Sequence, residues 1–471
     1  MAVRSADLVR SLTLTHTTAL VVGTVIGTGV FLKTAIMAQD TGSPAFVLAA
    51  WVVAGLLSLA GALAYAELGA MLPEAGGEYV YLRQAYGEAA AFFYGWTRVF
   101  VSGTGSIAIL GVGFATFLGA VLPMRAVWAQ ATFTILGQPI DWQFGLTQVV
   151  AVAAILLFAV VNCLSVAFGG RVQSVLTVLK VGGIAALVLG IFVRSETADW
   201  GHLAAPASQA TSGISAFGLA LLAALWAYDG WNNMPMAAGE VKDPGRNVPR
   251  ALIWGMVAVM AIYCLANLAY FYALPFAEVL ASSSTTHRQA LPVATKAAQT
   301  VFGEYGGKLI SIAFIVSALG ALNGSTLSNA RVPFAMARDG FFFAWAGVVS
   351  AGTRSPVYAL LMQACWASVL ALSGTYDQLT DYVIFASWIF YALVTSAVFV
   401  LRRTAPEAPR PYRTLGYPIV PLAFVLVAGW LVVNTLVNRP VQSVAGLVLI
   451  ASGLPVYVYY RMRNRATSAV S

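Results

Sequence analysis

The chain has 471 residues, of which 59% are hydrophobic and only 9% are charged, against about a quarter charged in typical soluble domains. This composition excludes an ordinary soluble protein and predicts an all-α polytopic membrane protein. The net charge of +8 does not indicate nucleic-acid binding, because the basic residues gather in loops on one side of the predicted membrane spans.

Twelve apolar segments are predicted to cross the bilayer, since each is long enough to span its ~30 Å hydrocarbon core as a helix. They are residues 15–38, 43–72, 87–122, 146–165, 170–193, 213–239, 250–274, 306–337, 355–373, 379–401, 416–437 and 441–460. The connections are short, so we expect one transmembrane domain over residues 1–471. The first span follows a short leader and precedes further spans, which does not match a cleaved signal peptide.

The basic residues indicate how the chain is oriented. Most lysines and arginines fall in loops that a cytoplasmic N-terminus would leave inside, among them those in residues 402–413 and 461–465. This asymmetry follows the positive-inside rule. We therefore expect a multi-pass protein of the cell membrane, inner or plasma, with both termini cytoplasmic.

Two spans are interrupted at mid-membrane depth. The first contains residues 23–31 (GTVIGTGVF), and the sixth contains residues 225–240 (LWAYDGWNNMPMAAGE). Glycine, proline, asparagine and a carboxylate do not suit an uninterrupted lipid-facing helix. The pair of breaks predicts a binding site between discontinuous helices. A channel would instead need a continuous polar lining.

The first break suits an anion. Glycines at Gly27 and Gly29, beside Thr28, permit backbone conformations that expose N–H groups. The half-helix that starts at Val30 would point the positive end of its dipole at the break, where backbone donors could hold a carboxylate. The alternative is that small residues only allow close helix packing; the second break favours binding.

Asp229 is the only acidic residue deep in the sixth span. It could cap the half-helix that resumes after Gly230, it could meet a positive group of a ligand, or it could do both. Trp226 and Trp231 flank it, and a bulky aromatic beside a small-molecule site can close over the ligand as a lid. Packing and interfacial contact are the more common roles of a membrane tryptophan.

Lys180 lies about ten residues into the fifth span, and therefore ~15 Å deep in the membrane. Snorkelling from that depth is difficult. A fixed ammonium there could replace a bound cation, or it could take up and release a proton. A structural role as a donor to broken-helix carbonyls is the alternative, although an intramembrane lysine favours function.

Other charged residues are assigned to the membrane edge. Glu67, Glu74, Glu78 and Arg83 are expected to form a solvated or gate-forming charge network there. Arg98, in the inner half of the third span, is expected to snorkel.

The sequence gives no indication of an enzyme. Its three cysteines all fall within spans and its three histidines are scattered, so we expect no loop disulfide, metal or other cofactor. It has no GxxxxGK[ST] motif, so energy would have to come from exchange or from a gradient.

Six groups of residues together carry a family resemblance. They are 25–31 (VIGTGVF), 65–81 (YAELGAMLPEAGGEYVY), 226–232 (WAYDGWN), 240–249 (EVKDPGRNVP), 323–325 (NGS) with 331–340 (RVPFAMARDG), and 410–418 (RPYRTLGYP). In order and spacing the chain resembles the amino acid, polyamine and organocation (APC) transporters, most closely the bacterial relatives of the L-type amino acid transporters. The motifs span nearly the whole chain.

The resemblance implies a LeuT-like fold of twelve helices with helices 1 and 6 broken. Residues 15–193 and 213–401 would be two inverted repeats, and residues 416–460 two additional helices. It also implies a sodium-independent amino acid permease that works by alternating access. We expect an antiporter that exchanges neutral L-amino acids; a proton-coupled symporter, or a carrier of cationic amino acids and polyamines, is the alternative.

The resemblance places the substrate at the two breaks. The substrate carboxylate would meet the backbone of Thr28, Gly29 and Val30, in the break that includes Gly27. The amino group would meet carbonyls around Val25 in this break and around two residues of the sixth span.

Those two residues are Trp226 and Ala227, and Trp226 would also be the aromatic gate. Asp229 completes the substrate-binding set and leaves the preferred substrate open, because many L-type members have a small residue there. Lys180 would occupy the region where other LeuT-like carriers bind sodium.

One departure from the family concerns a partner. Animal L-type members pair with a glycoprotein through a cysteine in the outer loop between spans 3 and 4. The corresponding residues here, 122–145, include no cysteine. We therefore expect no disulfide-linked heavy-chain partner.

Overall fold

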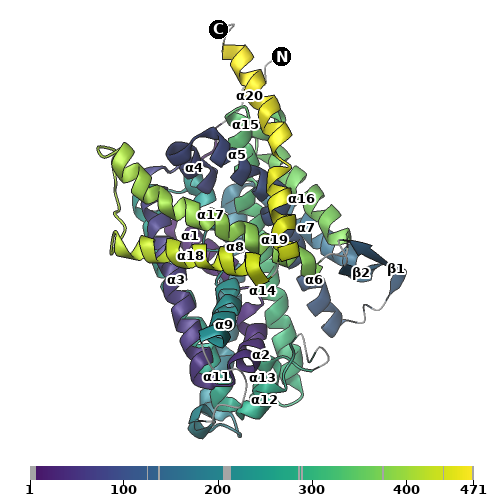
Figure 1. The fold of residues 1–471 in the computed structure, drawn as a ribbon. Helices are drawn as coiled ribbons and strands as arrows, with labels where there is room; N and C mark the ends of the chain where they lie inside the picture. Colours follow the sequence, from purple (N-terminus) through teal and green to yellow (C-terminus); the bar gives the residue numbers. More distant parts are fainter. Residues whose placement is uncertain are drawn as a thin grey trace.

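The computed structural model is almost entirely helical (Figure 1). It describes residues 7–122, 124, 126–135, 138–204, 214–284, 287, 290–373, 376–438 and 440–468. The elements up to the second break are α1 (Leu14–Val25), α2 (Gly29–Thr41), α3 (Pro44–Met71), α4 (Glu78–Tyr86), α5 (Glu88–Thr97), η1 (Arg98–Ser102), α6 (Gly103–Val121), β1 (Val127–Ile135), β2 (Gln138–Gly145), α7 (Leu146–Leu164), α8 (Val166–Arg194), η2 (Trp200–Ala204) and α9 (Ile214–Ala227). After it come α10 (Asn233–Met236), η3 (Ala238–Glu240), α11 (Pro244–Ala273), α12 (Phe276–Leu280), α13 (Val293–Phe302), α14 (Tyr305–Asn329), α15 (Arg331–Arg338), η4 (Ala344–Gly347), α16 (Val357–Leu372), α17 (Tyr376–Thr404), α18 (Ile419–Asn438), α19 (Pro440–Ala451) and α20 (Leu454–Ser468).

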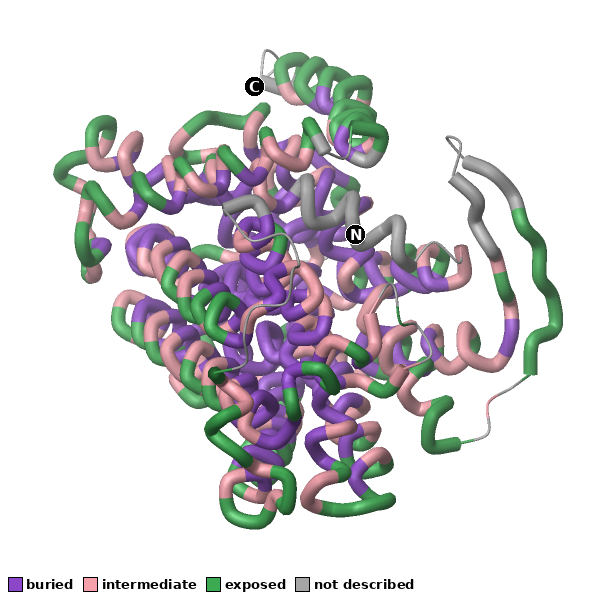
Figure 2. Tube along the Cα trace, turned by 60° about the horizontal axis from the view of Figure 1, so that its bottom comes forward, coloured by how far each residue is buried: buried purple, intermediate pink, exposed green. Residues whose placement is uncertain are grey.

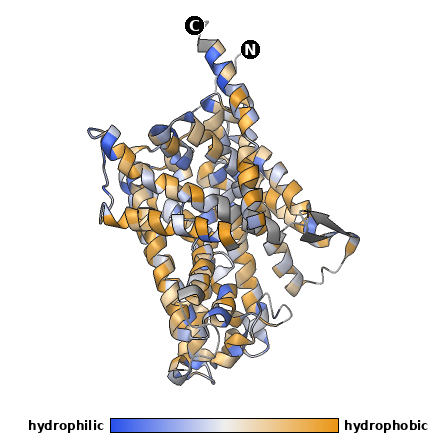
Figure 3. Cartoon of the chain, viewed as in Figure 1, coloured by the Kyte–Doolittle hydropathy of each residue, from blue (hydrophilic) through white to orange (hydrophobic). Residues whose placement is uncertain are grey.

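Among the described residues, nine helical stretches are long and apolar enough to cross a membrane, and two shorter apolar helices accompany them. Hydrophobic residues run along the lengths of α3 and α18 (Figure 3). This pattern confirms a polytopic helical membrane protein. The count of twelve spans and their division into two inverted repeats remain predictions.

Buried residues occupy the middle of the bundle (Figure 2), where α1, α3 and α11 pack together. Small residues allow this packing. A Cβ added to Gly255 of α11 would lie 2.7 Å from Val21 Cγ1 of α1, and one added to Gly55 of α3 would lie 2.7 Å from Met260 Cγ. Such close approach is how helices associate where lipid weakens the hydrophobic driving force.

Both predicted breaks are present. Helix α1 ends at Val25, Ile26 is extended (φ −72°, ψ 90°), and α2 begins at Gly29. Helix α9 ends at Ala227, and a turn leads to α10 at Asn233. The broken first and sixth spans are thereby confirmed.

Two elements differ from the expectation. Residues 122–145, expected to be a plain loop, contain β1 and β2, which pair antiparallel with Val127 opposite Gly145. Their β-branched and aromatic residues suit a strand. Helix α11 begins at Pro244, before the predicted start at residue 250, because proline is well tolerated in the first turn of a helix.

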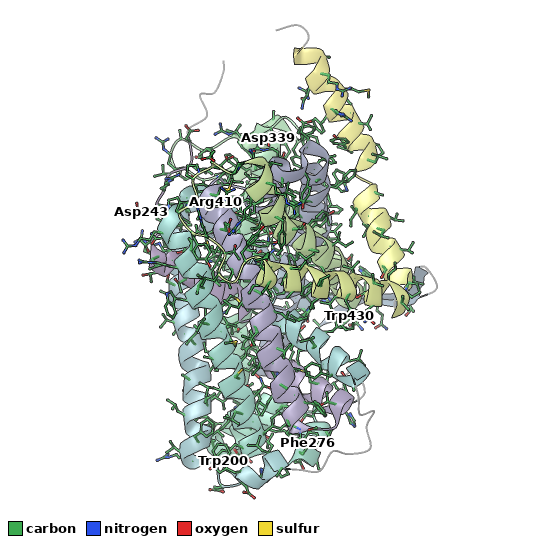
Figure 4. The ribbon with its side chains drawn as sticks, turned by 60° about the vertical axis from the view of Figure 1, so that its left-hand side comes forward. Trp200, Asp243, Phe276, Asp339, Arg410 and Trp430 are labelled. Atoms are coloured by element: carbon green, nitrogen blue, oxygen red, sulfur yellow. The ribbon has the colours of Figure 1, made fainter. Side chains whose placement is uncertain are left out.

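Charged side chains concentrate at the end of the bundle that carries α4, α15 and α20. Figure 4 shows Asp339 and Arg410 at this end and Trp200 and Phe276 at the opposite end. Arg331 of α15 pairs with Glu240 of η3, with Nε 2.7 Å and Nη2 3.0 Å from the two carboxylate oxygens. Neither side chain is exposed.

The four residues expected to form one charge network do not do so. Glu67 accepts two hydrogen bonds from Arg402 and one from the backbone of Thr414. Arg83 pairs with Glu74 and with Asp339 instead. Glu78 is buried and bonds to Tyr65 and Tyr94 instead. The expected network is therefore three separate groups: Glu67 with Arg402, Glu74 with Arg83, and Glu78 with the tyrosines.

Candidate functional site

The first break presents backbone donors at its start. The first N–H groups of a helix have no acceptor within that helix, and in α2 these belong to Gly29 and Val30. Thr28, the N-cap, makes no side-chain capping bond. Gly27 and Thr28 are only half-buried, whereas Val30 is fully buried. The predicted carboxylate site is therefore a short stretch of backbone at a positive helix end.

The two breaks touch each other. A Cβ added to Gly29 would lie 2.5 Å from Ala227 Cβ, so only glycine allows α2 to start against the end of α9. The Thr24 hydroxyl donates to the Gly230 carbonyl at 2.9 Å. Gly230 has φ 118°, which only glycine adopts readily. Four sequence-predicted residues, Gly29, Val30, Trp226 and Ala227, are thus brought to one place.

Lys180, at the middle of α8, is bound to the first break. Its ammonium donates to the carbonyls of Gly23 (2.8 Å), Ile26 (2.7 Å) and Ser317 (2.9 Å). An ammonium has three N–H donors, and all three are engaged. The side chain is 2% exposed. Lys180 therefore joins α8, the broken first span and α14 from inside the bundle.

Ser317 and Tyr263 are further donors at the breaks. The Ser317 hydroxyl lies 2.9 Å from the carbonyls of both Ile26 and Gly27. The Tyr263 hydroxyl lies 2.9 Å from the carbonyls of both Val25 and Ala227, so it bridges the two breaks. The Ile26 carbonyl also accepts from Lys180, and the Val25 carbonyl also accepts from the Gly27 N–H. The Ala227 carbonyl keeps a second lone pair for a ligand ammonium.

Sequence reasoning missed the contact that Tyr263 makes. The residue lies in an apolar span without a break, and nothing local distinguishes its hydroxyl from that of other membrane tyrosines. The usable signal is chemical: a tyrosine hydroxyl at mid-span depth needs a buried partner. The broken helices supply that partner.

Asp229 is bound by a tyrosine. The Tyr391 hydroxyl of α17 donates to Asp229 Oδ1 at 2.6 Å. Helix α10 begins later, at Asn233, with Asn232 as its N-cap, so Asp229 does not cap it. Trp226 and Asp229 are each half-buried, which leaves both within reach of a small molecule.

Arg98 does not snorkel. It lies in a π-helical turn, η1, is 6% exposed, and donates to Asn329 Oδ1 at 2.7 Å and to Asn233 Oδ1. The expectation was wrong because buried amides of α10 and α14 accept hydrogen bonds from the guanidinium inside the bundle. The sequence around Arg98 does not indicate these partners, since they lie on other helices. Short π-helical insertions often occur at functional sites.

Glu78 lies beside the second break. Its carboxylate accepts from Tyr65 at 2.6 Å, from Asn232 at 3.2 Å, and from Tyr94. Burial raises the pKa of the Glu78 carboxyl, and the positive charge of Arg98 opposes that rise. The second break is thus surrounded by hydroxyl, amide and carboxylate groups.

This arrangement can hold a zwitterion. Backbone donors at the start of α2 suit a carboxylate, and the Ala227 carbonyl at the end of α9 suits an ammonium. No group of three or more metal-ligating side chains occurs in the described part of the chain.

Comparison with known proteins gives a consistent result. A family model described as "Amino acid permease" matches residues 12–459. The chain is 33% identical over 452 residues to the serine/threonine exchanger SteT of Bacillus subtilis, covering 95% of this chain and 96% of that protein. It is 30% identical over 463 residues to the human b(0,+)-type amino acid transporter 1, covering 97% and 89% of the two chains.

A third relative, the human large neutral amino acids transporter small subunit 2, is 29% identical over 456 residues, covering 95% of this chain and 80% of that protein. These relatives are transporters and not enzymes. The match extends over nearly the full length, and the two broken helices meet at the site described above. On this evidence the chain belongs to the amino acid permease family of the APC superfamily.

Proposed function

We propose that this chain is a sodium-independent exchanger of neutral L-amino acids that works by alternating access. The observation that carries the proposal is the position of Lys180, whose ammonium donates to the carbonyls of Gly23, Ile26 and Ser317. Converging carbonyl oxygens beside a broken helix are also how half-helix transporters coordinate sodium. A fixed ammonium there supplies the positive charge within the chain.

The substrate would lie between the breaks. Its carboxylate would accept from the backbone of Thr28, Gly29 and Val30, and its ammonium would donate to the carbonyls around Val25, Trp226 and Ala227. Trp226 would close over the substrate as the gate, and Asp229 with Tyr391 would contact its side chain. The exchange activity named for SteT, a relative across the whole chain, supports an antiporter.

Two alternatives concern coupling and substrate. In the first, Lys180 releases and regains a proton during the cycle, and uptake is symport with protons. In the second, Asp229 attracts cationic amino acids or polyamines. We further propose that the chain lies in the cell membrane with both termini cytoplasmic and works without a disulfide-linked heavy chain, since its three cysteines lie within α7, α11 and α16.

The test is uptake of radiolabelled serine, threonine and leucine by purified protein in sodium-free proteoliposomes. We expect uptake into vesicles preloaded with unlabelled amino acid to far exceed uptake into empty ones, with no gain when sodium is added. A strict need for sodium would overturn the proposal. Uptake into empty vesicles that follows an imposed proton gradient would favour the symport alternative, and conductance without trans-stimulation would indicate a channel.

A further inference from the structure

Lys33 places a positive charge on the gate. Its Nζ lies 4.3 Å from the centroid of the Trp226 ring, a separation at which an ammonium is attracted to the face of an indole. Lys33 is half-buried in α2. A lysine that snorkels would extend toward water instead, whereas this contact places the ammonium one turn from the first break.

The same face of α2 carries Gly29, one turn before Lys33. A Cβ added to Gly29 would lie 3.5 Å from Trp226 Cζ3. The indole therefore extends along α2 from the backbone donors at the helix start to the Lys33 ammonium. A substrate held at those donors and covered by Trp226 would have this ammonium as a close neighbour.

Every amino acid carries the same α-carboxylate and α-ammonium, so the Lys33 charge can discriminate only through the side chain. A cationic side chain in this pocket would be repelled, and a neutral one would not. Asp229, three residues after Trp226, carries the opposite charge, and the Tyr391 hydroxyl that donates to its carboxylate leaves that charge in place. The preference for neutral side chains therefore depends on Lys33 lying closer to the bound side chain than Asp229 does.

We propose that Lys33 is a specificity-determining residue that restricts the site to neutral amino acids by repelling cationic side chains. The inference rests on the proposed function and deepens it, since it names the substrate class and the residue that sets it. A residue that only supported the gate would affect all substrates alike.

The test compares pairs of competitors that differ mainly in side-chain charge: arginine with citrulline, and lysine with norleucine. Each competes with exchange of a labelled neutral amino acid in proteoliposomes. We expect wild type to prefer the neutral member of each pair. Lys33→Met should reduce that preference by about tenfold or more, the effect expected when a like charge a few ångströms away is removed.

Two variants serve as controls. Lys33→Arg keeps the charge and should keep the preference. Lys308→Met removes an exposed lysine of α14 and gives the same change in net charge away from the site, so it should leave the preference unchanged. If Lys33→Met yields no transport, ligand-induced thermal shifts in detergent replace the transport assay. They measure the ratio of binding between the two members of each competitor pair, for Lys33→Met and for Lys33→Gln.

The inference is overturned if Lys33→Met lowers transport or binding of all four competitors equally, or if wild type already prefers arginine to citrulline. If wild type does not exchange the labelled neutral amino acid, the proposed function itself fails. That result is distinct, because the uptake of the neutral amino acid alone reveals it.

Discussion

The two breaks differ in what satisfies their backbone. In the first, donors from distant helices converge on the carbonyls: Lys180 reaches Gly23 and Ile26, and Ser317 reaches Ile26 and Gly27. In the second, single hydroxyls reach the carbonyls of Ala227 and Gly230. The other groups there are side chains that bond to one another, such as Asp229 with Tyr391. The first break is therefore held in one shape by its contacts, whereas the second offers groups that can exchange partners with a ligand.

The largest expected effect comes from removing the donor that holds the first break. Lys180→Met would remove the charged donor from three buried carbonyls, and a hydrogen bond to a charged group contributes about 1.5–3 kcal/mol. We expect exchange to be abolished while the protein still elutes as a single species in detergent. Lys308→Met is the matched control. Wild-type exchange in Lys180→Met would show that the ammonium is dispensable and would refute its assigned role.

Tyr263→Phe tests the link between the breaks. It removes only the hydroxyl that lies 2.9 Å from both the Val25 and Ala227 carbonyls. A lost buried hydrogen bond of this kind is worth about 1–2 kcal/mol, so we expect exchange to fall roughly tenfold. Tyr305→Phe, at a tyrosine that is 72% exposed, is the control. Equal rates in the two variants would mean that the breaks move independently of this bridge.

Asp229→Asn tests whether the second break contacts the substrate. Asparagine can still accept from Tyr391, so the fold should be kept and only the charge lost. We expect KM for exchange to change by about threefold to tenfold and the order of preferred substrates to change with it. Unchanged KM and unchanged substrate order would reduce Asp229 to a structural partner of Tyr391.

The smallest effect concerns Glu78 and pH. Because burial raises its pKa, the folded protein holds this proton more tightly than the unfolded chain does. The resulting stability is fully present below the ordinary glutamate pKa and is lost as pH rises through the raised value. We expect the melting temperature of wild type to fall over this window and that of Glu78→Gln to fall less. If the melting temperatures of wild type and Glu78→Gln change with pH in parallel, the titration of Glu78 does not contribute to stability in this window.

The sequence was informative at several residues that are unsuited to their own helices. Glycines at Gly27 and Gly29 and a carboxylate at Asp229 are locally unfavourable in a membrane span, so both breaks could be predicted. Lys180 was informative for the same reason: carbonyls of a broken helix were one expectation for its partners, whereas its third acceptor, Ser317, could not be predicted. Tyr263 and Arg98 could not be assigned, because their roles depend on which distant helices meet them.

The buried Glu240–Arg331 pair has a consequence for how the protein is made. Its two members are 91 residues apart in the chain, so Glu240 is synthesised and inserted well before its partner. An uncompensated buried charge costs about 3–5 kcal/mol, and a nascent chain must keep this carboxylate hydrated until α15 arrives. Fragments that end before Arg331 should consequently be degraded in cells, unlike fragments that end after it, and co-expression of the missing segment should rescue them.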